Sequence, residues 1–284
     1  MPELPEVETV RRVLSEVLPA RTISEVRLRK PEMLKGQAPA PFIRGLRGRR
    51  IREVGRRAKF LLIRLESSAL LVHLGMSGQI FFESPDSPLP MEKERLDRHT
   101  HLILDLDPAA RLYFRDPRMF GRFALIDREE ENALFRRLGP EPLGRKFTSR
   151  SLGEALRGRR AYLKALLLDQ RIAAGMGNIY VDESLHRAGI DPRTPGGELS
   201  ERMVRRLHAA IRSVLREAVH KGGSSLSDFL DPRHRKGKFQ LALRVYGREG
   251  KPCSKCGAPI RKSVVGQRGT HWCPECQPTT RSGG

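Results

Sequence analysis

All four cysteines of the 284-residue chain lie between positions 253 and 276, as two C-x2-C pairs. The segment reads "CSKCGAPIRKSVVGQRGTHWCPEC", and the sixteen residues between the pairs are enough for a β-hairpin. Two thiolates from each pair can bind one tetrahedral ion, and this spacing is typical of a zinc ribbon. All four ligand positions would then be filled, which predicts one structural zinc ion held by Cys253, Cys256, Cys273 and Cys276.

The chain as a whole is strongly basic. It has 54 Lys and Arg against 33 Asp and Glu, a net charge of +21. Such a charge favours a polyanionic partner, and nucleic acid is the commonest one, although a ribosomal or membrane-surface role would also fit. No apolar run approaches the roughly 18 residues of a membrane span, and the acidic, proline-bearing start differs from a secretory signal. We therefore expect a cytoplasmic protein with reduced thiols.

Apolar periodicity changes twice along the chain. After a helical stripe from Glu6 to Leu18, six short runs alternate with turns and predict antiparallel strands of a sandwich or barrel: "KFLLIRL", "ALLVHLG", "QIFFE", "HLILDL", "RLYFR" and "RFALID". The segment "LGPEPLGRKFTS" then reads as a linker. Helical sequence follows, clearest in "LSERMVRRLHAAIRSVLREAVHKGG", where Ser200 is a candidate N-cap and Gly222–Gly223 a stop.

Several positions outside the cysteines carry candidate functional groups. In the opening "MPELPEVETV", Pro5 suits the first turn of a helix, but this does not explain Pro2 or Glu3. Lys59 begins an apolar strand, which would hold its stem in place. In "GMGNIYVDESL", Asn178 would lie at a helix N-terminus suited to a phosphate. "RDPRMFG" places a phenylalanine on a turn, either as core or as a wedge between bases.

The motifs occur in the order found in one known family. "PELPEVETV", "KFL", "HLGMSG", "RDPRMFG", "LLLDQRIAAGMGNIYVDESL" and "VYGREGKPC", followed by the four cysteines, resemble formamidopyrimidine-DNA glycosylase over about residues 1–277. The resemblance implies a multidomain α+β fold with an N-terminal antiparallel β-sandwich flanked by helices, a helical helix-two-turn-helix domain and a C-terminal zinc-ribbon finger. The implied segments are a catalytic domain (1–132), linker (133–150), helix-two-turn-helix domain (151–231), lesion-capping loop (232–245), zinc finger (246–277) and disordered tail (278–284).

The resemblance also implies residue roles. Pro2, once Met1 is removed, would be the nucleophile at the sugar C1′, and Glu3 the acid that assists ring opening, with Glu6 in support. Lys59 would transfer protons and contact phosphate, while Arg268 would bind phosphate during the second elimination. The implied DNA contacts are His73, Met76, His99, Arg118, Phe120, Arg159, Lys164 and Asn178, among which Met76, Arg118 and Phe120 would fill the gap left by the extruded nucleotide.

The implied activity is excision of oxidised purines from damaged double-stranded DNA by a monomer without an organic cofactor, followed by strand cleavage through β- and δ-elimination. An N-terminal amine suits this chemistry, because its ordinary pKa of about 8 leaves an appreciable neutral fraction near pH 7. Two alternatives remain open from the residues: an endonuclease VIII-like enzyme for oxidised pyrimidines, and a non-catalytic zinc-ribbon protein that binds nucleic acid. The second would leave "PELPE" without a role.

Overall fold

The computed structural model describes residues 2–86, 88, 97–226 and 229–279. The chain divides into two compact units. The first comprises Met1–Arg136 and Lys221–Gln240, and the second comprises Arg137–His220 and Leu241–Gly284. The segment after the longest helix thus belongs with the N-terminal part of the chain. The finer boundaries expected from the sequence stay predictions, and residues 280–284 of the expected tail lie outside the described residues.

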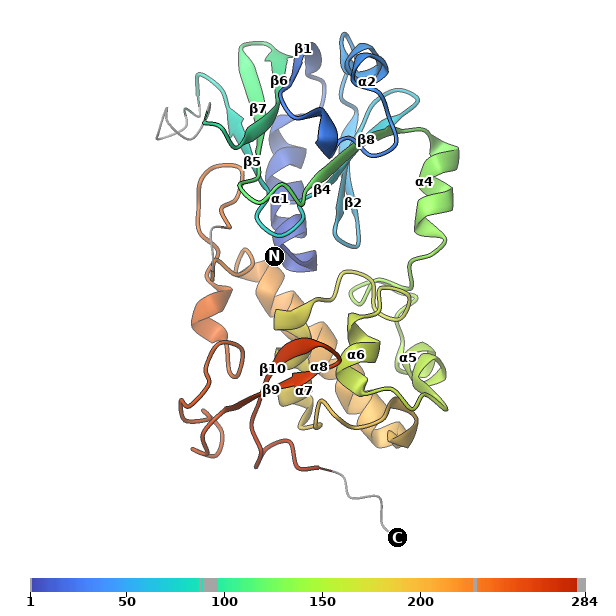
Figure 1. The fold of residues 1–284 in the computed structure, drawn as a ribbon, viewed down its shortest axis with the longest axis vertical. Helices are drawn as coiled ribbons and strands as arrows, with labels where there is room; N and C mark the ends of the chain where they lie inside the picture. Colours follow the sequence, from blue (N-terminus) through green and yellow to red (C-terminus); the bar gives the residue numbers. More distant parts are fainter. Residues whose placement is uncertain (1, 87, 89–96, 227–228, 280–284) are drawn as a thin grey trace. The chain divides into compact units, whose positions relative to one another are not determined.

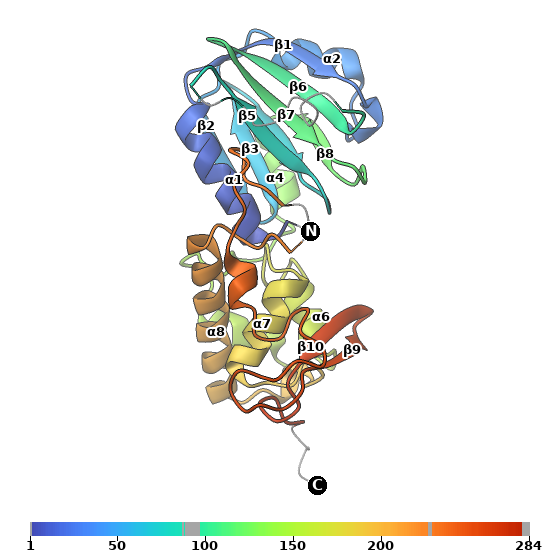
Figure 2. The same cartoon turned by 90° about the vertical axis from the view of Figure 1, so that its left-hand side faces the viewer.

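Two antiparallel four-stranded sheets form the first unit (Figures 1 and 2). One sheet has the order β1-β6-β7-β5, with β1 Thr22–Leu28, β5 Gln79–Glu83, β6 Thr100–Asp107 and β7 Ala110–Arg115. The other has the order β2-β3-β4-β8, with β2 Glu53–Arg57, β3 Phe60–Arg64, β4 Ala69–His73 and β8 Arg122–Ile126. The six strands expected from the apolar runs are all present.

Helices complete this unit: α1 Leu4–Val17, the short η1 Pro31–Met33, α2 Pro39–Leu46 and α4 Arg128–Phe135. α1 packs against β2 and β3, while α2 packs against β1 and β8. The apolar stripe of α1, including Val7, Val10 and Leu14, is fully buried in one core that also takes side chains from both sheets. The predicted β-sandwich flanked by helices is confirmed.

The second unit is helical and ends in a two-stranded hairpin. Its elements are α5 Ser149–Leu156, α6 Leu163–Leu168, α7 Asn178–Ala188, η2 Gly196–Glu198, α8 Glu201–His220, β9 Arg261–Val265 and β10 Arg268–Trp272, while η3 Phe239–Ala242 spans the boundary between units. α7 packs against α6, α8 and β10. α8 starts as predicted, with the Met203 N–H 3.3 Å from Ser200 Oγ, and is followed by Gly222 and Gly223, both at positive φ.

None of the helices among the described residues is both long enough and apolar enough to cross a membrane.

Candidate functional site

The start of the chain is buried in the first unit. Pro2 and Glu3 are buried, and Glu3 is the N-cap of α1. One carboxylate oxygen of Glu6 accepts the Glu3 N–H at 2.8 Å, and the other accepts the Ser224 N–H at 2.7 Å. Gly223 has φ +77°, and a Cβ there would lie 2.7 Å from Glu6 Oε1, so glycine permits this approach. The Glu6 carboxylate therefore ties the candidate catalytic residues to the segment that follows α8.

Lys59 occupies a tight turn between β2 and β3, in which Arg57 pairs with Phe60. Its neighbour Ala58 is buried with φ +53°, a conformation that is costly for a residue with a Cβ. The Arg56 guanidinium stabilises the turn by donating to the Ala58 carbonyl at 2.9 Å. The turn is thus constrained on the side that leads into Lys59.

The same guanidinium fastens this turn to α1. Arg56 donates to Glu8 at 2.9 Å, and both side chains are largely buried. Burial acts to raise the pKa of Glu8, but hydrogen bonds from Arg11 and Arg56 outweigh it and lower the pKa to about 2. Glu8 therefore stays ionised, and the helix that starts at the chain end also braces the turn that carries Lys59.

His73 closes β4 beside this turn. Its ring lies 5.0 Å from that of Phe60, and its Nδ1 accepts the Gly75 N–H at 3.1 Å. Burial, followed by the nearby charges of Lys59 and Lys35, lowers the pKa of His73 to about 4. The imidazole is therefore neutral at pH 7, and it offers one N–H in addition to the Nδ1 acceptor.

Two turns present the expected wedge residues. Met76 and Phe120 are 39% and 50% exposed, unusually high for large apolar side chains. The Arg118 guanidinium lies 5.1 Å from the Phe120 ring centre. At Gly75, with φ +61°, a Cβ would lie 2.5 Å from the Phe120 backbone, so the two turns are in direct contact.

Asp116, which the sequence interpretation missed, joins these turns. It is fully buried and accepts from Ser77 Oγ at 2.6 Å and from the Gly121 N–H at 2.7 Å. Its own N–H donates to the carbonyl of half-buried His99 at 2.9 Å. Within "RDPRMFG" an aspartate resembles an ordinary turn residue, and only the fold reveals its partners.

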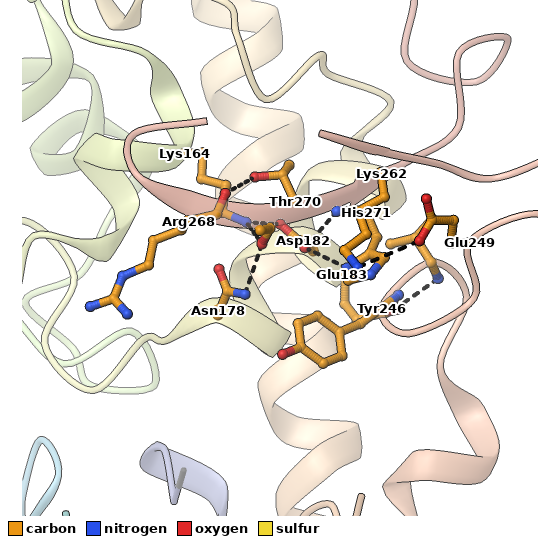
Figure 3. A network of polar contacts seen from close by, with 12 residues as sticks. Lys164, Asn178, Asp182, Glu183, Tyr246, Glu249, Lys262, Arg268, Thr270 and His271 are labelled. Atoms are coloured by element: carbon orange, nitrogen blue, oxygen red, sulfur yellow. Dashed lines mark hydrogen bonds and ion pairs between the residues drawn. The ribbon is translucent and has the colours of Figure 1, made fainter. Parts of the chain in front are cut away.

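The second unit contains a fully buried ion pair. Lys164, expected to contact DNA, has a fully buried side chain that donates to Asp182 at 2.7 Å and to the Gly269 carbonyl at 2.9 Å (Figure 3). The other Asp182 oxygen accepts the His271 N–H at 2.9 Å. The DNA contact expected of Lys164 stays a prediction, and in this structure its ammonium holds β10 from within the protein.

Two more residues of α7, Asn178 and Glu183, bind backbone groups of the hairpin and of the segment before it (Figure 3). The Asn178 amide donates to the Gly269 carbonyl at 2.9 Å. Glu183 accepts three consecutive backbone N–H groups, of Arg244, Val245 and Tyr246, at 2.9–3.1 Å. Burial raises the pKa of Glu183, while these bonds act in the opposite direction. α7 therefore holds both the hairpin and the segment that leads to it.

The cations that remain candidates for phosphate contact in this unit are exposed. Arg268 opens β10, opposite Val265, next to the two-residue turn at Gly266 and Gln267. In Figure 3 its guanidinium extends away from the buried network. Arg159 is also exposed, in the segment between α5 and α6.

The four cysteines form a metal-binding cluster. Their sulfur atoms all lie within 4.8 Å of one another, and three of the pairs are 3.5–3.8 Å apart. Four sulfurs around a tetrahedral zinc ion at about 2.3 Å would be about 3.8 Å apart. The described cysteines form no disulfide. The donor set and its spacing fit one structural zinc ion.

Comparisons with known proteins agree with this arrangement. Three family models match: the formamidopyrimidine-DNA glycosylase N-terminal domain at residues 1–123, the formamidopyrimidine-DNA glycosylase H2TH domain at 138–229, and the zinc finger found in FPG and IleRS at 250–279. The zinc finger match supports the single structural zinc ion.

Relatives match over almost their whole length. Formamidopyrimidine-DNA glycosylases of Roseiflexus sp. and Chloroflexus aggregans are 45% and 48% identical, and each comparison covers 98% of this chain and at least 98% of the relative. The MutM (Fpg) structure from Thermus thermophilus has a TM-score of 0.85 at 44% identity, covering 97% of this chain and 98% of that one. Lactococcus lactis Fpg in complex with abasic-site DNA has a TM-score of 0.88 at 35% identity, covering 98% and 100%. The chain belongs to the formamidopyrimidine-DNA glycosylase family.

Proposed function

We propose that this protein removes oxidised purines, namely 8-oxoguanine and formamidopyrimidines, from double-stranded DNA and then cleaves the abasic site. The family membership supports a base-excision repair enzyme with glycosylase and lyase activities over a non-catalytic zinc-ribbon protein. The observation that carries the proposal is the chain start, which is buried, capped and held through Glu6. A frayed terminus would be expected if the first residues had no role.

The proposed nucleophile is the secondary amine of Pro2, exposed by removal of Met1. Its lone pair attacks C1′ of the damaged nucleotide as the bond from C1′ to the base breaks, and the proton that the amine loses neutralises the departing base. The bond from C1′ to the ring oxygen then breaks, and Glu3 supplies the proton that this oxygen takes up. The resulting iminium is cationic without protonation and withdraws electrons from C2′. Loss of a C2′ proton expels the 3′ phosphate, and a second elimination expels the 5′ phosphate.

The other candidate residues have separate roles in the proposal. Glu3, next to Pro2, supplies the acid for ring opening, and Lys59 transfers protons and contacts phosphate. Met76, Arg118 and Phe120 fill the space of the extruded nucleotide, which offsets the cost of unstacking, a few kcal/mol. We assign the remaining DNA contacts to His73, His99, Arg159 and Asn178, and the phosphate contact during the second elimination to Arg268.

The direct test is borohydride reduction during turnover, with three duplexes that contain 8-oxoguanine opposite cytosine, a formamidopyrimidine or thymine glycol. We expect a covalent protein–DNA adduct and faster excision of the two purine lesions. Faster excision of thymine glycol would instead support the oxidised-pyrimidine alternative, which deserves inclusion because a Lactococcus lactis Fpg structure contains an oxidised pyrimidine in its DNA. Absence of any adduct with all three duplexes would contradict the enzymatic proposal.

We also propose a cytoplasmic location, with association to the nucleoid through DNA binding, and a monomeric state. The net charge of +21 supports the DNA association. The proposed lesion-capping loop, 232–245, begins in the first unit, where the Pro232 carbonyl accepts the Phe82 N–H at 3.0 Å.

A further inference from the structure

His186 has no part in the proposed reaction, yet it lies against a cysteine of the metal-binding cluster. It belongs to the last turn of α7 and is 1% exposed. Its Nε2 lies 3.5 Å from Cys253 Sγ, within hydrogen-bonding distance for sulfur. Cys253 is itself buried, so the contact is shielded from water.

The end of α7 packs closely on the cysteine segment. Gly189, at φ +63°, would bring a Cβ within 3.1 Å of the Cys276 carbonyl, and the Ile190 carbonyl accepts from the Gln277 side chain at 2.9 Å. A zinc ion with four thiolates carries a net charge of −2, and the C-terminal end of a helix carries a partial negative charge. The negative charge of the zinc–thiolate site and that of the helix end repel each other, and hydrogen-bond donors placed between them reduce this repulsion.

Backbone amides supply some of these donors. The Lys255 N–H donates to Cys253 Sγ and the Cys276 N–H to Cys273 Sγ, both at 3.4 Å and both within the cysteine segment. His186 adds a donor from α7, because the group on the other side of the contact, a metal-bound thiolate, can only accept.

The surroundings also select the tautomer of His186. A neutral imidazole has one N–H, and placing it on Nε2 directs it at Cys253 Sγ. Nδ1 has no hydrogen-bond partner among the described residues, so the alternative tautomer would leave a buried N–H without an acceptor there and two lone pairs facing each other at the sulfur.

We propose that His186 is an outer-sphere residue of the zinc site, which donates its Nε2–H to the Cys253 thiolate. The bond draws electron density from that sulfur and makes it a weaker target for protons and electrophiles. His186 thereby slows the loss of zinc from the finger without being a ligand.

The test compares the release of zinc from four full-length, zinc-loaded proteins into an excess of a chromophoric chelator. His186→Phe keeps a ring but removes the donor, whereas His186→Gln returns an amide N–H close to the position of Nε2. His208→Phe is the matched control, because His208 Nε2 contacts the Phe147 carbonyl at 3.0 Å and no sulfur. We expect zinc release from His186→Phe to be about tenfold faster than from wild type, with His186→Gln and the control close to wild type. Equal rates for His186→Phe and wild type would overturn the proposal.

The absorption spectrum after substitution with Co²⁺ separates a hydrogen bond from mere packing. Removing a donor from a thiolate raises the energy of its lone pair, so the sulfur-to-cobalt charge-transfer band of His186→Phe should shift to longer wavelength and return in His186→Gln. Faster zinc release with an unchanged band would reduce His186 to a packing residue and overturn the proposal. A change in coordination number in His186→Phe would make His186 a direct ligand and also overturn it.

The wild-type protein gives a check that does not depend on a variant folding. A long-range ¹H–¹⁵N spectrum of the zinc-loaded protein reports which ring nitrogen of His186 carries the proton. The Nε2–H tautomer is expected. The Nδ1–H tautomer would overturn the proposal.

Discussion

Both units bury carboxylates on a helix, but these carboxylates bind different groups and hold different parts of the chain in place. On α1, each Glu6 oxygen accepts a backbone N–H, and one of them belongs to Glu3 at the start of the chain. On α7, Asp182 pairs with a fully buried lysine and also accepts a backbone N–H of β10. The first arrangement fixes the group proposed to react, whereas the second fixes a hairpin that presents the exposed Arg268. The first unit thus positions the proposed chemistry, and the second positions a cation that we propose binds phosphate.

Zinc removal should have the largest effect, and it should disturb the second unit while leaving the first unit folded. Because the β9–β10 hairpin lies between the two cysteine pairs, we expect chelation to unfold it and to lower DNA affinity about 100-fold or more while the sandwich stays folded. Fluorescence anisotropy with a lesion duplex measures the affinity, and hydrogen exchange of β3, β4 and β6 reports the fold of the first unit. Unchanged affinity after chelation would contradict the role given to the finger.

The next largest effect should come from Lys164→Met. It leaves Asp182 buried and charged without its cation, which should destabilise the second unit by about 3–5 kcal/mol and weaken DNA binding, although Lys164 contacts no solvent. Urea unfolding measures the loss. Lys262→Met, at a half-exposed lysine whose ammonium lies 3.5 Å from Glu249, is the control and should cost less than about 1 kcal/mol. Equal losses for both variants would show that the buried pair has no special importance.

In the first unit, His73 should make stability sensitive to acid. Its folded pKa of about 4 lies below the unfolded value of about 6.5, so its stabilising contribution is complete above pH 6.5 and is lost as the pH falls towards 4. His73→Asn keeps an acceptor near Nδ1 but cannot titrate. The free energy of unfolding should therefore fall by about 2–3 kcal/mol less between pH 7 and pH 4 in the variant. The exposed His220→Asn should behave as wild type, and parallel pH profiles for all three proteins would refute the assignment.

The smallest loss of stability, but a selective loss of activity, is expected for Glu6→Gln. One of the two carboxylate–amide bonds becomes a contact between two donors, which costs about 1–2 kcal/mol. Displacement of the chain start should slow single-turnover excision by about tenfold to a hundredfold while DNA affinity stays unchanged. Glu129→Gln, at an exposed glutamate in the first turn of α4, is the control. Equal losses of excision and DNA affinity in Glu6→Gln would contradict a positioning role.

The sequence predicted features whose cause is local. Cysteine spacing predicted the metal-binding cluster, alternation predicted six strands, and Ser200 marked the start of α8. The edge strands β1 and β2 were not predicted. "TISEVRL" contains a register shift between Ile23 and Glu25, and "EVGRR" contains a glycine and consecutive arginines. Neither segment alternates cleanly between apolar and polar residues.

Features that depend on distant partners could not be predicted in this way. Lys164 resembles a surface lysine until Asp182, eighteen residues later, is found beside it. Its one local signal is its position among buried leucines of α6, including Leu163 and Leu167. Asp182 and Glu183 look like ordinary polar residues of a helix in "VDESL", although Lys164 and backbone amides from other segments satisfy their oxygens.

The most direct test of the account is to locate the covalent bond to DNA. After borohydride reduction with an 8-oxoguanine duplex, proteolysis and mass spectrometry should find the sugar remnant on the nitrogen of Pro2 in protein that has lost Met1, and no adduct in protein that retains it. A remnant on Lys59 or another lysine, or equal trapping with Met1 present, would contradict the central claim that the buried chain start is the nucleophile.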